Sequence, residues 1–544
     1  MKKRNLLPFQ LFAACLVGLI LGKFCFSTTK DKVELSLFNG KPSKLQSVMN
    51  IIENRYVDIL DIDSLTELSI PDVLSHLDPH SSYVPMINRN ANEKSITGKF
   101  CGVGIEYNIF NDTLETLYIT PDGPAYRSGV RAGDKILAID SVSTVGPNAR
   151  AISSAMLRGE KHSKVSISIK RQGVDSIINL TIIRDDIKVR TVTCSYAIDS
   201  LTAYIKITNF GDSTYNEFMR KVGPLKESGI KNLIIDLRNN GGGRVEQVRR
   251  IASEILHKGD TIAFTVNRDG NIEEMYIDTV TNGICKQMRI ICMVNTNTAS
   301  ASEILAGAIQ DNDRGIIVGR RTFGKGLVQT PIELNDGSLV RLTTYRYYTP
   351  SGRSLQKGYE EYTNDYQNRK ANGELDSAGA YRAKDSSQYL TRNGRVVYSK
   401  GGINPDIFVP EPSSERSRLQ WQMDSAYIVM RFASMTYAEE LLKEPEAIKQ
   451  DISDIACSRK FMDNMLDFAR RQGVQVNTRR DKKEIEQNRE RWTADFTGHV
   501  YHIMGNDDEQ ARYLNQNDRD LETAADILAD ESRYLEILNK ETEE

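Results

Sequence analysis

The sequence predicts a multidomain chain with a helical N-terminal segment, a β-rich domain, a mixed α/β core and a helical C-terminal extension. Three observations support this prediction. At 544 residues the chain has room for roughly three to four domains. Short alternating strands with turn signals fill residues 98–184, whereas strands and helices alternate over 202–410. The residues that follow are charged and helix-forming.

The composition is that of folded, soluble domains. Hydrophobic residues make up 40% of the chain, charged residues 26%, and the formal net charge is −2. This balance provides no basic surface for nucleic acid, so we expect no nucleic-acid partner. The counts of 37 Gly and 15 Pro exclude a collagen-like or wholly disordered chain.

Residues 1–27 predict a signal peptide or a membrane anchor. Lys2, Lys3 and Arg4 precede an uncharged apolar run that extends from Leu6 to Gly22. At about 1.5 Å per residue this run spans about 25 Å, slightly less than a bilayer core of about 30 Å. The run can therefore be either a cleaved signal peptide or an uncleaved membrane anchor. A lipoprotein is disfavoured, because the large Phe24 precedes Cys25. In either case we expect the body of the protein outside the cytoplasm.

Seven cysteines, odd in number and widely spaced, predict no disulfide framework. The chain has no Cys-x-x-Cys pair of the kind that binds zinc. We therefore expect most of these thiols to behave as small buried hydrophobic groups.

The next two regions differ in periodicity. Residues 28–95 are predicted to be helical, because Leu45, Val48, Met49, Ile52 and Tyr56 recur at helical spacing. Residues 96–186 form the β-rich domain. Its clearest strands are IEYNIF, TLYIT, KILAID, KVSISIKR and IINLTIIR, and a short helix is expected at 149–157.

Residues 187–412 form the α/β core. The near-continuous apolar runs IKNLIIDL and MRIICMVN are typical of central strands. Within the core, residues 357–400 are polar with little periodicity, which predicts a surface insertion. Residues 413–544 form the charged helical C-terminal region.

A candidate nucleophile lies where one central strand gives way to a helix. The strand ends near Asn295, a polar turn follows, and the helix begins at about Ala301. Ser300 and Glu303 form a Ser-x-x-Glu capping box at that helix. Ser300 is thus either an ordinary N-cap or a nucleophile beside helix amides that could stabilise an oxyanion.

A serine nucleophile needs a base, and none of the six histidines lies near Ser300 in sequence. A basic residue, Lys325, follows 25 positions after Ser300 and is flanked by Gly324 and Gly326. A lysine acts as a base only when neutral, which requires its pKa to fall about three units through burial. Without further context, a lysine between two glycines is an ordinary loop residue.

Three other patterns match known binding motifs only in part. The stretch from Gly319 to Gly326 has phosphate-loop spacing, but it lacks the final Ser or Thr and precedes a predicted strand. His76 and His80 have metal-ligand spacing, but Pro79 breaks the helix that they would need, so a structural turn is favoured. DLRNNGGG lacks dinucleotide-binding spacing, yet its glycines can present N–H groups to an oxyanion.

TASASEILAGAIQD, GRRTFGKGLVQ, LTTYRYYTPSGRSLQ and GGINPDIFVP, in this order, closely resemble the C-terminal processing peptidases. These are serine–lysine endopeptidases that carry a PDZ domain. The resemblance continues upstream through LDPHSSYVP, PDGPAYRSGVRAGDKILAIDS, LRGEKHSKVSISIKR, YIKITNFGD and LIIDLRNNGGG, and covers about residues 45–410. It identifies residues 187–412 as a serine-peptidase core and 96–186 as a PDZ domain.

The resemblance implies a role for each site residue. Ser300 would be the nucleophile, Lys325 the general base and Gln329 the residue that orients the lysine. Asp311 matches a family acid, for which a catalytic role and a helix-end structural role both stay open. The oxyanion hole would consist of the N–H of Ala301 and that of Gly241 or Gly242. Neither the insertion nor the C-terminal region is expected to touch the catalytic residues.

The PDZ domain is predicted to bind a peptide through Phe100, Cys101, Gly102, Val103 and Gly104, which match the family's carboxylate-binding loop. Its glycines would offer N–H groups to a terminal carboxylate, while the next strand pairs with the peptide.

We therefore expect an exported serine endopeptidase, periplasmic or held in the cell envelope, with anchoring in the inner membrane left open. It would recognise proteins or peptides with free C-termini and cleave near that end, with no metal or other cofactor. Homo-oligomerisation stays open. The alternative is a catalytically silent PDZ scaffold or chaperone of the envelope. The presence of Ser300, Lys325 and Gln329 together argues against it.

Overall fold

The computed structural model describes residues 43–87, 89, 99–188, 190–377, 387–399, 401–412, 416–443, 452, 456 and 458–539. The chain divides into two compact units, with the boundary between Val73 and Leu74. The predicted leader at 1–27 lies outside the described residues. Within the described ranges, no helix has the length and apolarity needed to cross a bilayer.

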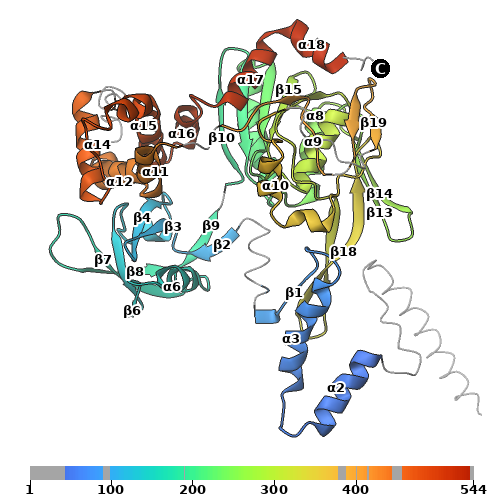
Figure 1. Ribbon diagram of the computed structural model, residues 1–544, viewed down its shortest axis with the longest axis horizontal. Helices are drawn as coiled ribbons and strands as arrows, with labels where there is room; N and C mark the ends of the chain where they lie inside the picture. The colour runs from blue at the N-terminus through green and yellow to red at the C-terminus, as the bar shows by residue number, and fades with distance from the viewer. Residues whose placement is uncertain are drawn as a thin grey trace, which may run out of the picture. The chain divides into compact units, whose positions relative to one another are not determined.

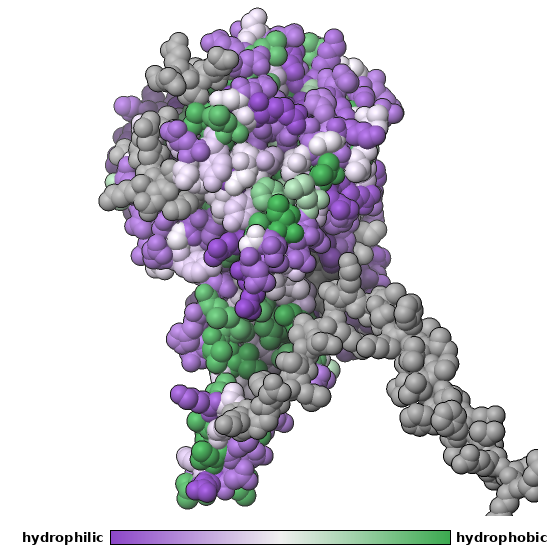
Figure 2. All heavy atoms as spheres, turned by 90° about the vertical axis from the view of Figure 1, so that its right-hand side faces the viewer, coloured by the Kyte–Doolittle hydropathy of each residue, from purple (hydrophilic) through white to green (hydrophobic). Residues whose placement is uncertain are grey.

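The predicted N-terminal helices are present. They are α2 (Lys44–Arg55) and α3 (Ile62–Ser75). Ser43 caps α2, because its hydroxyl accepts a hydrogen bond from the N–H of Gln46 at 3.2 Å. Many apolar side chains of this region are exposed, as the green spheres at the lower end of Figure 2 show. They include Leu45, Val48, Ile51, Tyr56, Val57, Ile59, Leu60, Leu68 and Val73.

The β-rich domain has the predicted strands and helix. Its elements are β2 (Lys99–Gly102), β3 (Ile105–Phe110), β4 (Thr113–Ile119), α5 (Pro124–Arg127), β5 (Lys135–Ile139), β6 (Val142–Ser143), α6 (Ala149–Met156), β7 (Lys164–Lys170), β8 (Ile178–Ile183) and β9 (Asp185–Lys188). The main sheet has the order β3-β4-β5-β7-β8, and β6 pairs with β5. Strand β3 is therefore an edge strand, and β2 pairs separately with β9.

The α/β core is built on a six-stranded sheet. Its strands, in spatial order, are β10 (Val192–Ala197), β11 (Thr202–Ile207), β12 (Asn232–Asp236), β15 (Arg289–Val294), β16 (Gly315–Gly319) and β21 (Ile407–Phe408). From β11 onward all neighbours are parallel. The loops that follow β12, β15 and β16 therefore leave the same edge of the sheet, where α/β proteins place their sites.

Helices cover both faces of this sheet, with α8 and α9 on one side and α17 and α18 on the other (Figure 1). The first layer consists of α7 (Thr214–Glu227), α8 (Val245–Ile255) and α9 (Ala301–Asp311), and the second of α17 (Arg519–Ala529) and α18 (Glu531–Asn539). Part of the charged C-terminal region is thus a layer of the core. Buried free thiols lie in this core at Cys194, Cys285 and Cys292 and in the β-rich domain at Cys101, as predicted.

A second sheet carries the segment after β16. It has the order β1 (Ser82–Val84), β18 (Leu339–Tyr348), β13 (Thr261–Val266) and β14 (Ile272–Ile277), and β17 (Leu327–Glu333) also pairs with β18. Pairing of Tyr83 with Val340 brings the residues around position 80 close to β17 and β18.

The predicted surface insertion at 357–400 is exposed over much of its described length, but some of its side chains are buried. The segment contains η1 (Tyr359–Tyr362), α10 (Asp365–Ala371), β19 (Gln388–Leu390) and β20 (Val396–Tyr398). Lys357, Arg369 and Leu375 are each only 2% exposed. Polar side chains enter the interior here because they are paired: Arg369 lies 3.0 Å from Asp365, and Glu374 binds Arg321 at 2.6 Å.

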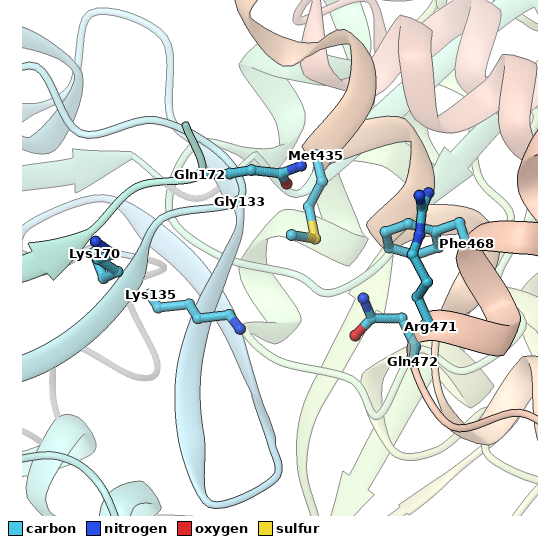
Figure 3. Close-up of a pocket in the computed structure, with 8 residues that line it drawn as sticks. All are labelled: Gly133, Lys135, Lys170, Gln172, Met435, Phe468, Arg471 and Gln472. Atoms are coloured by element: carbon cyan, nitrogen blue, oxygen red, sulfur yellow. The ribbon is translucent and has the colours of Figure 1, made fainter. Parts of the chain in front are cut away.

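The rest of the C-terminal region forms a helical bundle that packs on the β-rich domain. Its helices are α11 (Arg418–Ser425), α12 (Ile428–Lys443), α14 (Arg459–Arg471), α15 (Lys482–Ile503) and α16 (Asp507–Leu514). A buried ion pair joins Arg431 of α12 to Glu115 of β4 at 2.9 Å. A pocket of about 390 Å³ lies between the bundle and the β-rich domain, and Figure 3 shows its lining residues, with Met435 next to Gly133. None of its lining residues belongs to the loops after β12, β15 or β16.

Candidate active site

Ser300 lies at the turn between β15 and α9, as the sequence predicts, and α9 begins at Ala301. Its backbone has φ +58° and ψ −120°, a conformation that residues other than glycine rarely adopt. Such strain persists only where surrounding contacts enforce it, and it is concentrated at functional sites. The N-terminal end of α9, with its positive dipole, directly follows this serine.

Glu303 holds the nucleophile and the lysine together. Its carboxylate is fully buried and accepts four hydrogen bonds. Oε2 accepts from the N–H of Ser300 and from the N–H of Lys325, each at 2.9 Å. The two backbone nitrogens are therefore separated by at most twice that distance. Oε1 accepts from Thr322 Oγ1 at 2.6 Å and from Gly324 N–H at 2.8 Å.

Tyr347 makes a second bridge between the same two residues. Its hydroxyl oxygen lies 3.1 Å from the carbonyl oxygen of Ser300 and 2.5 Å from that of Lys325. Tyr347 belongs to β18 and is 1% exposed. Two independent buried groups thus fix the main chain of the serine relative to that of the lysine.

The surroundings of Lys325 favour its neutral form. Burial lowers the pKa of its ammonium below the ordinary value, and the positive charge of Arg341 acts in the same direction. The negative charges of Glu303 and Asp78 oppose this shift but do not cancel it. The direction of the shift is the one that a lysine base requires.

The glycine loop after β12 approaches Ser300 closely. A Cβ atom on Gly242 would lie 2.9 Å from Ser300 Cβ and 3.0 Å from Ala301 N, and Gly242 has φ +104°. The N–H of Gly242 donates to Asn240 Oδ1 at 2.9 Å. Within the described ranges, the N–H groups of Gly241 and Ala301 have no acceptor. Of the two glycines proposed for the oxyanion hole, Gly241 therefore has the available N–H.

Gln329 lies on β17, in a chain of polar contacts that sequence reasoning missed. Its Nε2 donates to Thr343 Oγ1 at 3.2 Å, and that hydroxyl donates to Asp78 Oδ1 at 3.1 Å. Asp78 also accepts from the backbone N–H groups of His80 and Ser81, which confirms the predicted turn. No local pattern signals these contacts, because they join segments that are far apart in sequence.

His80 lies closer to the site than the sequence suggested. Its Nε2 is 3.1 Å from the hydroxyl of Tyr362. Burial and the nearby charge of Lys325 lower the pKa of His80 to about 4. The imidazole is therefore neutral at pH 7. Among the described histidines, His80 is the one whose pKa is changed by the charge of Lys325.

Asp311 does not lie with these residues. It is the last residue of α9, 11 residues after Ser300, so the helix separates the two by about 16.5 Å at 1.5 Å per residue. Its carboxylate is bound by Arg353 and by the hydroxyl of Ser351, each at 2.6 Å. Of the two roles left open for Asp311, this geometry supports the structural one.

The insertion reaches the loop that carries Lys325. Arg369 donates to the carbonyl oxygens of Arg321 at 2.8 Å and Thr322 at 3.0 Å. The N–H of Lys357 donates to the carbonyl oxygen of Gly324 at 3.1 Å. The insertion thus contacts the main chain of the loop that carries Lys325, next to the catalytic residues that it was expected not to touch. Strand β17 follows this loop, which agrees with the rejection of a phosphate-loop helix.

The predicted carboxylate-binding loop connects β2 to β3. Phe100, Cys101 and Gly102 belong to β2, while Val103 and Gly104 form the connection. Their carbonyl oxygens accept from the N–H groups of Ala125 at 2.9 Å and Thr120 at 3.0 Å. Within the described part of the chain, the N–H groups of Val103 and Gly104 have no acceptor. The loop is thus fixed by its carbonyl groups, with two N–H groups available.

Comparisons with known proteins agree with this architecture. The sequence model of peptidase family S41 matches residues 201–366, and that of the PDZ domain matches residues 116–171. The carboxy-terminal-processing protease of Bartonella bacilliformis is 29% identical over 399 residues, which cover 68% of this chain and 91% of the relative.

The carboxy-terminal processing protease CtpA of Bacillus subtilis is 31% identical over 366 residues, which cover 66% of this chain and 76% of the relative. The solved photosystem II D1 C-terminal processing protease is 25% identical, with 67% of this chain and 92% of that chain covered and a TM-score of 0.36. The chain therefore belongs to the carboxy-terminal processing proteases of peptidase family S41 and is a serine peptidase with a PDZ domain.

Proposed function

We propose that this peptidase uses Ser300 as nucleophile and Lys325 as general base. The observation that carries the proposal is the pair of hydrogen bonds from the backbone N–H groups of both residues to one oxygen of Glu303. The lowered pKa of Lys325 supports the proposal, because burial increases the fraction of the amine that is neutral near pH 7.

In the first step Ser300 Oγ attacks the scissile carbonyl carbon while Lys325 Nζ takes the hydroxyl proton. The N–H groups of Ala301 and Gly241 stabilise the resulting oxyanion. Lys325 then returns the proton to the leaving amine, and water resolves the acyl-enzyme. Gln329 acts through its Oε1 atom, because its Nε2 is already bound to Thr343. This oxygen accepts from the ammonium and holds the lysine in place.

The same proposal assigns the choice of substrate to the PDZ domain. The N–H groups of Val103 and Gly104 bind the terminal carboxylate of a protein substrate. The peptide pairs with β3, which is an edge strand among the described strands. Cleavage then occurs near that C-terminus.

The experiment compares a free-acid peptide substrate with its C-terminal amide. Amidation removes the charged acceptor and should cost about 1.5–3 kcal/mol, or roughly ten- to hundredfold in kcat/KM. Gly104→Val should reproduce the loss with the free acid, because Gly104 has φ +76° and a Cβ would lie 3.1 Å from Ile187 Cδ1. Equal cleavage of acid and amide would refute C-terminal selection while leaving the serine–lysine chemistry intact.

We also propose that the protein is exported and acts in the periplasm or cell envelope. The basic residues at positions 2–4 and the apolar run after them support this proposal. A reporter fused after Lys41 should be active outside the cytoplasm. Activity confined to the cytoplasm would refute export, and the mass of the mature protein distinguishes a cleaved leader from an intact anchor.

A further inference from the structure

Two aspartates of the C-terminal region bind arginines at the edge of the core sheet that carries the active site. Asp518 caps α17, where it accepts from the N–H groups of Asp520 and Leu521. Its carboxylate also accepts from Arg238 at 2.6 and 2.9 Å. Asp520, in the first turn of the same helix, is 4% exposed and binds two arginines.

The two arginines bound by Asp520 come from different catalytic loops. Arg238 lies in the loop after β12 that leads to Gly241, and it donates to Asp520 Oδ2 at 2.9 Å. Arg320 directly follows β16, in the loop that leads to Lys325, and it donates to the same oxygen at 2.6 Å and to Oδ1 at 2.9 Å. Strands β12 and β16 are the two neighbours of β15, which leads to Ser300. One carboxylate thus joins the loops on both sides of the nucleophile.

The charges at this position form a balanced, largely buried network. Besides the two aspartates of α17, Arg238 binds the fully buried Asp236, which also accepts from Lys206 at 3.0 Å and from Tyr204 at 2.7 Å. The guanidinium of Arg320 has one further acceptor in the described structure, the carbonyl oxygen of Val409 at 3.0 Å. Without Asp520, Arg320 would remain a buried cation with no acidic partner.

Helix α17 is held at this position by its own packing. Leu521, Ala524, Ile527 and Leu528 are buried against the strands of the core sheet. The hydroxyl of Tyr534, from α18, lies 3.1 Å from both the N–H and the carbonyl oxygen of Ile290. The position of Asp520 is therefore determined by an apolar contact that does not involve the arginines.

We propose that Asp520 is a positioning residue for catalysis, and that docking of α17 makes the C-terminal region an activator within the same chain. This inference rests on the proposed serine–lysine function. Asp520 touches no reacting atom. It acts by fixing the loop of Gly241, which stabilises the oxyanion, relative to the loop of Lys325, which supplies the base.

The test uses Asp520→Asn in the full chain, with Glu522→Gln as the matched control. Glu522 is an exposed acid on the same helix. We expect Asp520→Asn to lower kcat at least tenfold while KM stays within twofold, because the PDZ domain that binds the peptide is unchanged. Deuterium uptake by residues 236–243 and 320–326 should rise in this variant and not in the control.

A double variant, Asp520→Asn with Arg320→Gln, separates positioning from stability. Removing both charges relieves the unpaired buried cation, so the midpoint of thermal unfolding should recover. The bridge is still missing, so kcat should stay low. If the double variant recovers kcat as well as stability, the proposal is overturned. It is also overturned if Asp520→Asn alone has a kcat within twofold of wild type.

Ser300→Ala identifies failure of the proposed function itself. If the wild type cleaves the peptide no faster than this variant, the serine–lysine function is wrong. Deuterium uptake by the two loops then tests the inference. Unchanged uptake by residues 236–243 and 320–326 in Asp520→Asn overturns it, and increased uptake supports the role of Asp520 in joining these loops.

Discussion

Replacing Glu303 by glutamine tests how the site is assembled. The side chain keeps its size, but one carboxylate oxygen becomes an NH₂ group that cannot accept a hydrogen bond. Each oxygen of Glu303 accepts from two donors, so either orientation of the amide leaves two buried donors without an acceptor. At about 1–3 kcal/mol for each such donor, the loss is about 2–6 kcal/mol.

The lower end of this range already predicts a clear kinetic effect. If about 2 kcal/mol is lost from transition-state stabilisation, kcat/KM falls about thirtyfold. The pH profile should change as well. The negative charge of Glu303 raises the pKa of Lys325, so its removal lowers that pKa further. Because Lys325 acts as the neutral amine, the rising limb of kcat/KM should move to lower pH while the plateau falls.

The assay is the pH dependence of kcat/KM for a fluorogenic free-acid peptide. Glu246→Gln is the control, since Glu246 is an exposed acid in the first turn of α8 that pairs with Arg249. Exposed pairs of this kind contribute little, and the control should match the wild type. A Glu303→Gln plateau within twofold of wild type, or a limb displaced to higher pH, would refute the reasoning.

Two further substitutions test the oxyanion loop and the far end of α9. Gly242→Ala should abolish cleavage, because the new Cβ would lie 2.9 Å from Ser300 Cβ; Gly223→Ala, whose Cβ meets nothing within 4 Å, should leave kcat unchanged. Asp311→Asn should lower the unfolding free energy by about 3–5 kcal/mol through the buried Arg353, with kcat per folded molecule unchanged. Full activity of Gly242→Ala, or a large loss of kcat in folded Asp311→Asn, would contradict the roles assigned to these residues.

The parts of the fold that follow from local pattern were predictable. The central strands are continuous apolar runs, and α9 has both a capping residue and an apolar face, so the turn at Ser300 could be located from sequence. The same holds for β3, whose bounds at 105–110 follow from its alternating side chains.

The contacts that assemble the site were not predictable in this way. Glu303 was expected only to cap its own helix, yet it also binds the N–H of Lys325. Tyr347 and Asp520 reach the catalytic loops from strands and helices far along the chain. Periodicity reports which face of an element is buried, but it does not report which distant polar group a buried donor will meet.

The polarity of the insertion predicted its exposed residues but not its buried ones. Arg369 belongs to this polar segment, yet its guanidinium lies in the interior, where it binds two carbonyl oxygens. A buried charge is tolerated once it is paired and hydrogen-bonded, and its partners come from other segments of the chain.

The pH dependence of kcat/KM in the wild type, compared with Lys325→Met, tests most directly whether Lys325 is the base. We expect wild-type kcat/KM to rise with pH through a pKa below the ordinary lysine value of 10.5, and Lys325→Met to show no measurable cleavage. A base must be deprotonated to act, so activity is lost as pH falls through its pKa. A profile that is flat from pH 6 to 9 would contradict the account. It would instead indicate a base already neutral at pH 6, such as His80 with a pKa of about 4.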